Sequence, residues 1–381
     1  MGTPPAGLGA VVDADTPLYG GLDEIKLTNQ TLKKAESLAA KLWGADYARF
    51  STGGSTHANQ AIIFALGKPG EKVAVSRTAH RSVLSALVLA GLEPIWMSPE
   101  IDAATGVPTG IGIAELDRAL KERPIAVLLT EPGYLGTISD LPILISAAHA
   151  VDVPVILDAA WGGHFGFHPE LPRHAFQVGA DALITSTHKA LPGYSASALL
   201  LARTTLLSAE RLEQSFETTH TTSPAGAPLA SIDGVRALLE TRGEELIGKL
   251  LSNIHRFKEM VQAEFPLPIF LYPSDFPEGR FDPSKIVLRV QQLGASGVDI
   301  EEDLQAQGIR VEMADRDTIV FLGTIADSTE DFDRLADALI PILKKRQEQR
   351  RESATALSWS VIPQRGISMR DAYFAKTEMV D

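Results

Sequence analysis

Between residues 28 and 203 the sequence alternates segments of helical spacing with short, continuous apolar runs such as KVAVS, PVILDAA and ASALLLAR. These runs lack the polar alternation of strands that face water on one side, so both faces of the sheet are expected to be buried. Parallel strands need crossover helices between them, and those helices cover the sheet. The chain is therefore predicted to form an α/β fold with a mostly parallel sheet.

A different pattern begins after about residue 225, where a long helical region leads into the Pro- and Gly-rich stretch FPLPIFLYPSDFPEGRFDPS. Beyond it the pattern predicts a strand, a helix, two strands and a helix, which together form a smaller α+β unit. A chain of 381 residues is long enough for two or three units. We expect an N-terminal segment at 1–27, a large domain at 28–265, and a small α+β domain with a C-terminal tail at 266–381.

Composition excludes several classes of function. Acidic residues outnumber basic ones by 48 to 35, and this net charge of -13 argues against binding to nucleic acid or an anionic membrane. No apolar stretch is long enough to span a bilayer, no secretory signal is apparent, and there is no cysteine for disulfides. His164 and His168 are spaced i, i+4 but lack a nearby acidic third ligand. We expect a cytoplasmic protein with no metal site.

Two predicted strand ends carry ionisable residues. Lys189 follows ADALIT within SerThrHisLys, and Asp158 ends the apolar run PVIL. Open α/β sheets bind ligands at this edge, where burial lowers the pKa of a lysine and favours imine chemistry. A carboxylate there needs a cationic partner, such as a protonated pyridine nitrogen. The pair indicates pyridoxal phosphate, although a surface lysine and a helix-capping aspartate are the simpler interpretations of each residue alone.

The cofactor's phosphate and ring also have candidate partners. Residues 51–57, SerThrGlyGlySerThrHis, lie between a predicted strand and helix, where backbone N–H groups and the helix dipole form an anion site. Gly54, Ser55 and Thr56 are candidates to bind the phosphate, although many such turns bind nothing. His80 follows the strand KVAVS at the same sheet edge, where an imidazole can stack on the ring.

In their order and spacing, these motifs resemble the major domain of the ornithine/lysine/arginine decarboxylases. Those are pyridoxal-phosphate enzymes of the aspartate-aminotransferase-like fold, fold type I. The resemblance covers nearly the whole chain. It is carried by GLDEI, KKAESLAAKLWGAD, STGGSTHAN, AHRS, TEPGYLGTISDL, DAAWGGHFGFHPELP, GADALITSTHKAL, TTSPAGAPLASIDGVRALL and SMRDAYFAKTEMV.

The resemblance implies roles for individual residues. Lys189 matches the Schiff-base lysine, Asp158 the partner of the pyridinium nitrogen, and His80 the histidine that stacks on the ring. Thr222 and Ser223 match a segment that, in dimers of this family, reaches the neighbouring subunit's site, so a homodimer or higher even oligomer is implied. The full set of expected cofactor-binding residues is Gly54, Ser55, Thr56, His80, Asp158, Ala160, Trp161, Ser186, His188, Lys189, Thr222 and Ser223.

The resemblance also implies decarboxylation of arginine, lysine or ornithine to the corresponding amine and CO₂. Three departures from the family pattern bear on the substrate. TPPAGLGA lacks the proline-glycine-histidine-lysine motif of the substrate entrance, Gly133 stands where a threonine is common, and the family's C-terminal domain is expected to be absent. The alternatives are an aminotransferase or lyase with the same cofactor, and a non-catalytic cofactor-binding partner subunit. The presence of Lys189, Asp158 and His80 argues against the non-catalytic alternative.

Overall fold

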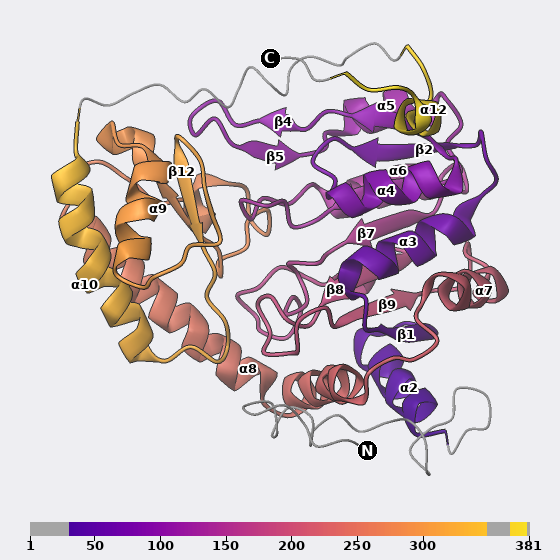
Figure 1. Cartoon of the computed structure of the whole chain (residues 1–381), viewed down its shortest axis with the longest axis horizontal. Helices are drawn as coiled ribbons and strands as arrows, with labels where there is room; N and C mark the ends of the chain where they lie inside the picture. Colours follow the sequence, from indigo (N-terminus) through magenta and orange to yellow (C-terminus); the bar gives the residue numbers. More distant parts are fainter. Residues whose placement is uncertain (1–29, 349–365, 379–381) are drawn as a thin grey trace.

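A computed structural model describes residues 30–348 and 366–378 (Figure 1). The segment expected at 1–27, with GLDEI and TPPAGLGA, lies outside these residues, as does 349–365 of the expected C-terminal tail.

The strands are β1 (Tyr47–Ser51), β2 (Lys72–Ser76), β3 (Glu93–Met97), β4 (Glu100–Ile101), β5 (Pro108–Gly110), β6 (Val127–Thr130), β7 (Val155–Asp158), β8 (Ala182–Ser186), β9 (Ala198–Ala202), β10 (Ile286–Arg289), β11 (Met313–Ala314) and β12 (Thr318–Phe321). The helices are α2 (Thr31–Trp43), α3 (Gly54–Leu66), α4 (Arg81–Ala90), α5 (Ile113–Leu120), α6 (Leu141–His149), α7 (Ala209–Thr219), α8 (Gly226–Gln262), α9 (Gly297–Ala306), α10 (Thr329–Arg346), α12 (Met369–Phe374) and the short 3₁₀ turns η1 (Ala175–Gln177), η2 (Pro273–Asp275) and η3 (Val290–Leu293).

The large sheet has seven strands in the order β1-β9-β8-β7-β6-β2-β3. Strands β8, β7, β6, β2 and β3 pair in parallel, and β9 runs antiparallel to both of its neighbours. The predicted mostly parallel sheet is therefore confirmed. Its register sets Thr130 beside Asp158 and Asp158 beside Ile184, so the carboxyl ends of β6, β7 and β8 meet at one edge.

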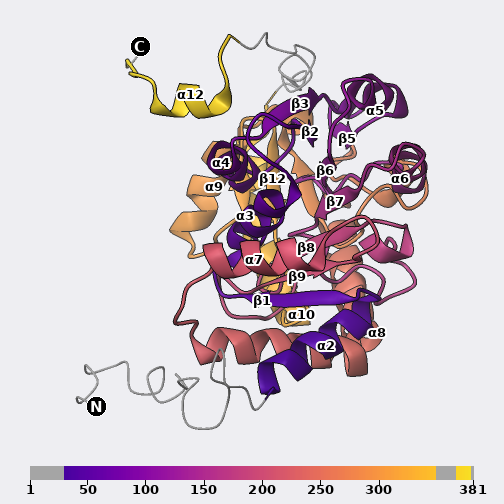
Figure 2. The same ribbon diagram turned by 90° about the vertical axis from the view of Figure 1, so that its right-hand side faces the viewer.

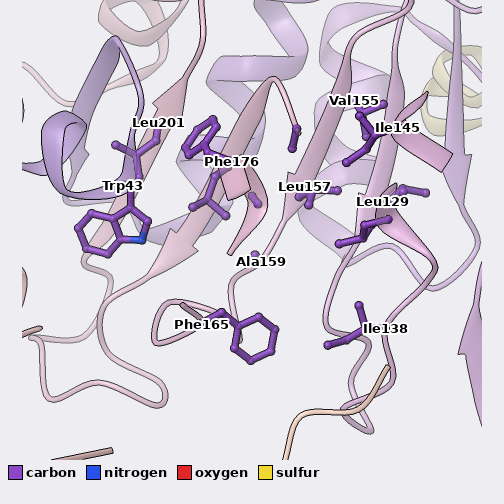
Figure 3. Packing of buried hydrophobic residues seen from close by; sticks show 14 of the residues in the cluster. Trp43, Leu129, Ile138, Ile145, Val155, Leu157, Ala159, Phe165, Phe176 and Leu201 are labelled. Atoms are coloured by element: carbon purple, nitrogen blue, oxygen red, sulfur yellow. The ribbon is translucent and has the colours of Figure 1, made fainter. Parts of the chain in front are cut away.

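Both faces of this sheet are covered by helices, as Figure 2 shows for α3 and α4 on one side and α5 and α6 on the other. Within β7, Val155 and Leu157 join the core beneath α2, α5 and α6 (Figure 3), whereas Ile156 packs beneath α3 and α4. This alternation has the period of two expected of a strand. With neither face open to water, polar side chains are left to the strand ends, where a site can form.

The smaller sheet is antiparallel, in the order β10-β12-β11, and packs with α9 and α10 as the expected α+β unit. Helix α8 belongs to both parts of the molecule (Figure 1): Leu229 and Leu239 lie in the core of the large sheet, and Phe257 and Val261 in the core of the small one. This helix therefore connects the two sheets. The domain boundary at residue 265 stays a prediction.

Two strand predictions in the smaller unit are too long. KIVLRVQQ leaves the sheet after Arg289, because the N–H groups of Gly294 and Ala295 turn back to carbonyls of η3. In IRVEMAD only Met313 and Ala314 form the strand β11, and the pairing ends where the Asp315 carboxylate accepts the N–H groups of Asp317 and Thr318 and so turns the chain. Helices α7 and α12 were not predicted. None of the described helices combines the length and apolarity needed to cross a bilayer.

Gly193 limits the packing of the loop that carries Lys189. Its N–H donates to the Thr187 carbonyl at 2.7 Å, and an added Cβ would overlap that oxygen and lie 2.8 Å from Thr187 Oγ1. We expect Gly193→Ala to lower the free energy of unfolding by about 1–3 kcal/mol, the usual cost of overpacking.

The control is Gly234→Ala on the exposed side of α8, where a new methyl group meets nothing within 4 Å. It should be neutral, or stabilising by up to about 1 kcal/mol, because alanine favours helix. Urea denaturation of both variants measures the difference, and equal stabilities would contradict this account of Gly193.

Candidate active site

Asp158 lies at the carboxyl end of β7 with only 3% of its surface exposed. Its Oδ2 accepts a hydrogen bond from Asn59 Nδ2 at 2.8 Å, and its Oδ1 accepts one from the Ala160 N–H at 3.2 Å. Burial raises the pKa of this carboxyl group, and the hydrogen bond from Asn59 opposes that effect. Both hydrogen-bond partners are neutral, so the carboxylate is oriented but not neutralised. Sequence reasoning missed Asn59, because α3 also carries His57 and Gln60 and nothing in the sequence set this amide apart.

Lys189 lies three residues after the end of β8, the strand next to β7 in the sheet. Its Nζ lies 4.2 Å from the centre of the Trp161 ring, and Trp161 is itself buried. Burial lowers the pKa of Lys189, while the charges of Asp158 and Glu312 oppose the shift. A lowered pKa increases the share of the neutral amine, which is the form that attacks a carbonyl carbon. The structure thus places Lys189 over the Trp161 ring and within electrostatic range of Asp158, while the roles predicted for these residues stay predictions.

The start of α3 meets the end of β8 at the expected phosphate site. Ser55 Oγ lies 2.8 Å from Ser186 Oγ, which joins the two elements. The first N–H groups of a helix have no acceptor within it, and its dipole favours an anion there. Thr56, in the same turn, is exposed. Ser55 and Ser186 therefore offer two hydroxyl groups beside a helix N-terminus.

Gly54 does not act as the sequence suggested. Its N–H donates to the Ala196 carbonyl at 2.6 Å, so this amide is already used and is not a donor for an anion. Its φ of 68° shows why glycine is required, because this left-handed conformation is unfavourable for other residues. His188 lies beside Lys189, and its Nδ1 is 2.9 Å from the carbonyl oxygen of Ser197, the residue directly before β9.

His80 caps α4, where its Nδ1 accepts the Ser82 N–H and lies 2.8 Å from Ser82 Oγ. Burial lowers the pKa of His80, and the charges of Asp158 and Lys189 act on it in opposite directions. The ring is therefore within electrostatic range of both residues, and its stacking role stays a prediction. Thr222 and Ser223 are exposed on the loop between α7 and α8 and have no contact with Lys189 in this single chain.

His164 and His168 do not converge on one point. His164 is buried with Nε2 2.9 Å from Ser284 Oγ and 3.6 Å from Asp282 Oδ1. His168 instead accepts the Glu170 N–H. Within residues 30–348 and 366–378, no group of three or more histidine or acidic side chains is arranged to bind a metal.

Three further residues reach the Trp161 ring or its neighbours from other parts of the chain. The Tyr134 ring meets Trp161 edge-on at 5.5 Å, and its hydroxyl donates to Glu312 Oε1 at 2.8 Å. Lys285 Nζ lies 3.6 Å from the Trp161 ring centre. Sequence reasoning missed all three, and the only signal for Lys285 was a lysine directly before the buried strand IVLR.

Glu131 is a buried carboxyl group beside the same sheet edge. Its N–H donates to the Asp158 carbonyl at 3.0 Å, and its side chain accepts the Ser139 N–H at 3.0 Å and the Ser139 hydroxyl. These bonds close the loop that carries Tyr134. Burial raises the pKa of Glu131 to about 7, against the effect of the Ser139 hydrogen bonds.

The sequence is similar to a family of decarboxylases and to individual members with that name. The sequence model of the family described as Orn/Lys/Arg decarboxylase, major domain, matches residues 11–270. The arginine decarboxylase of Bacillus subtilis (strain 168) is 35% identical over 94% of this chain and 74% of that protein. The constitutive lysine decarboxylase of Escherichia coli (strain K12) is 26% identical over 60% of this chain and 34% of that protein.

A solved structure extends the similarity to the fold. Lysine decarboxylase A from Pseudomonas aeruginosa matches with a TM-score of 0.74 and 18% identity, over 94% of this chain and 57% of that one. The chain thus spans little more than half the length of that solved lysine decarboxylase. At this identity the likeness establishes the fold alone.

The pKa of Glu131 makes stability depend on pH. Its folded value of about 7 exceeds the ordinary 4.5, so the folded state retains a proton that the unfolded state loses between these values. The stabilisation is therefore complete below pH 4.5 and is lost as pH rises through 7. Glu131→Gln removes this titration. Between pH 4.5 and 7 we expect the free energy of unfolding of the wild type to fall by on the order of 3 kcal/mol relative to that of this variant. Urea denaturation at each pH measures both free energies. The same pH dependence in the two proteins would contradict the prediction.

Proposed function

This chain belongs to the Orn/Lys/Arg decarboxylase family and has the fold of the fold type I pyridoxal-phosphate enzymes, and on that premise we propose that it decarboxylates a basic amino acid. The observation that carries the proposal is the buried carboxylate of Asp158 at the same sheet edge as the amine of Lys189. Arginine is the first candidate substrate, since the relative named arginine decarboxylase is more similar over more of the chain than the relative named lysine decarboxylase.

The cofactor that we propose is pyridoxal phosphate, and the residues present fit it. Lys189 offers the amine for covalent attachment, Asp158 a carboxylate for the ring nitrogen, and Ser55 and Ser186 hydroxyls for the phosphate. The buried Thr187 Oγ1 has no hydrogen-bond partner among the described residues and is available to a ligand. When bound, this cofactor supplies an electron sink for the bond that breaks at the substrate's Cα.

Each residue has a separate task in this proposal. Asp158 holds a proton on the ring nitrogen, and Asn59 keeps its carboxylate in one orientation. Lys189 would hold the cofactor through Nζ, and its lowered pKa would favour proton exchange at that atom. Trp161 excludes water from one side of the Lys189 amine, and His80 is proposed to stack on the ring.

We also propose a homodimer, or a multiple of one, in the cytoplasm. The exposed Thr222 and Ser223 support the dimer, because exposed side chains on this loop are accessible to a neighbouring subunit. The absence of cysteine from the sequence is consistent with a reducing compartment.

The function is tested by incubating the cofactor-loaded protein with arginine, lysine or ornithine. We expect CO₂ and the corresponding amine in equal amounts, with arginine the best substrate. Detection of CO₂ combined with product mass distinguishes the alternatives. A keto acid without CO₂ would identify an aminotransferase, and no product from any of the three would contradict the proposal.

The role of Asp158 is tested by Asp158→Asn. An amide keeps the shape and can still accept from Asn59, but it lacks the charge that holds the ring proton. Charge-assisted hydrogen bonds contribute about 1.5–3 kcal/mol, so we expect kcat to fall at least about 10-fold while the cofactor still binds. Asp140→Asn is the control: asparagine caps α6 equally well, and the ion pair that is lost, Asp140 with Arg280 at 2.9 Å, involves no residue proposed to hold the cofactor. A wild-type rate for Asp158→Asn would contradict the role.

A further inference from the structure

Two buried lysines in the smaller unit differ in how their charge is satisfied. Lys258 on α8 is 2% exposed, and its Nζ donates to the carbonyl oxygens of Leu271 at 3.1 Å and Lys285 at 2.8 Å. Lys285 is 4% exposed, yet its Nζ donates no hydrogen bond to any residue in the described part of the chain. Lys258 is thus a structural lysine, whereas Lys285 keeps its hydrogen-bonding capacity.

The Lys285 ammonium lies within the candidate active site. Its Nζ is 3.6 Å from the centre of the Trp161 ring, and Lys189 Nζ is 4.2 Å from the same centre. The Tyr134 ring lies 5.8 Å from it on another side. Both lysine nitrogens therefore occupy the small volume around one indole ring.

Nearby carboxylates do not neutralise this ammonium by contact. Asp282 Oδ1 accepts from the Ser284 N–H at 2.9 Å and the Ser284 hydroxyl at 2.6 Å, and Glu312 accepts from the Tyr134 hydroxyl. Both act on Lys285 only as more distant charges. Burial lowers the pKa of Lys285 to about 8, with Asp282 and Glu312 opposing the shift and Lys189 adding to it. The group is therefore mostly charged at neutral pH, and a buried charge without a contacting partner is costly.

We propose that the ammonium of Lys285 binds the α-carboxylate of the amino-acid substrate. This inference rests on the proposed function, since it requires an amino acid at the site. The α-amine and α-carboxylate of an amino acid share one carbon, so their binding groups must be neighbours. Lys189 marks the place of the amine, and Lys285 supplies the neighbouring cation over the same ring.

The proposal gives Lys285 a positioning role. Holding the carboxylate fixes the rotation of the substrate about the bond between its nitrogen and Cα. That rotation decides which bond at Cα is aligned for cleavage. The smaller unit thereby contributes to the choice of reaction, whereas Asp158 and Lys189 both come from the large sheet.

The test compares two ligands that differ only in the carboxylate, arginine and its decarboxylated amine agmatine. Turnover is prevented by working in a Lys189→Ala background loaded with cofactor, and calorimetry measures both dissociation constants. With Lys285→Met added, we expect arginine to bind about 10- to 100-fold more weakly, the range for one charge-assisted hydrogen bond. Agmatine binding should change less than about twofold, since it has no carboxylate for Lys285.

Lys285→Arg in the same background is the matched variant. It keeps the positive charge and should retain most of the preference for arginine, and thermal unfolding of each protein confirms that it is folded. Equal weakening of arginine and agmatine, or no change in either, would overturn the role of Lys285 while leaving the proposed function intact. If the background protein with Lys285 present binds none of arginine, lysine and ornithine, the proposed function fails and this inference with it.

Discussion

The buried carboxylate of Asp158 is the constraint on which the rest of the site depends. β7 is covered on both faces, so the side chain at its carboxyl end cannot reach water. Its hydrogen bonds from Asn59 and Ala160 orient the group without neutralising it. The free-energy cost of that charge is recovered only when a cation binds. In the proposed function the site is therefore stabilised by its ligand, and the sheet register fixes the place of the carboxylate that the ligand would meet.

Trp161 organises the opposite side of the site. Its ring contacts Lys189, Lys285 and Tyr134, which come from three separate segments. A cation near an aromatic ring gains about 0.5–2 kcal/mol, less than the several kcal/mol that burial of an unpaired charge costs. The charge of Lys189 also lowers the pKa of Lys285. The arrangement supports the proposed binding of a carboxylate by Lys285, and it joins the small sheet to the large one at the point where chemistry is proposed.

Part of this site could be predicted because its residues lie at the ends of predicted strands. Asp158, Ser186 and Lys189 each end or closely follow a buried apolar run, and the parallel topology brings such ends to one edge. Gly54 shows the limit of that reasoning, since its turn was recognised but its amide is taken by Ala196, 142 positions further on. Asn59 was missed for another reason: it is one of several polar residues in the first half of α3, and only the position of Asp158 shows which of them is used.

The sequence by itself determined the fold class, the parallel strands and the residues at their carboxyl ends, because periodicity and residue chemistry are local properties. Those residues indicated the cofactor, and the resemblance to a family added the expected reaction and the expected dimer. Only the tertiary structure decided which distant side chains complete the site. Lys285 and Glu312 belong to the smaller unit, whose placement follows from α8 packing into both hydrophobic cores. Long-range packing of this kind depends on the whole chain at once, so no local pattern records that Lys285 meets Trp161 or that Lys258, equally buried, does not.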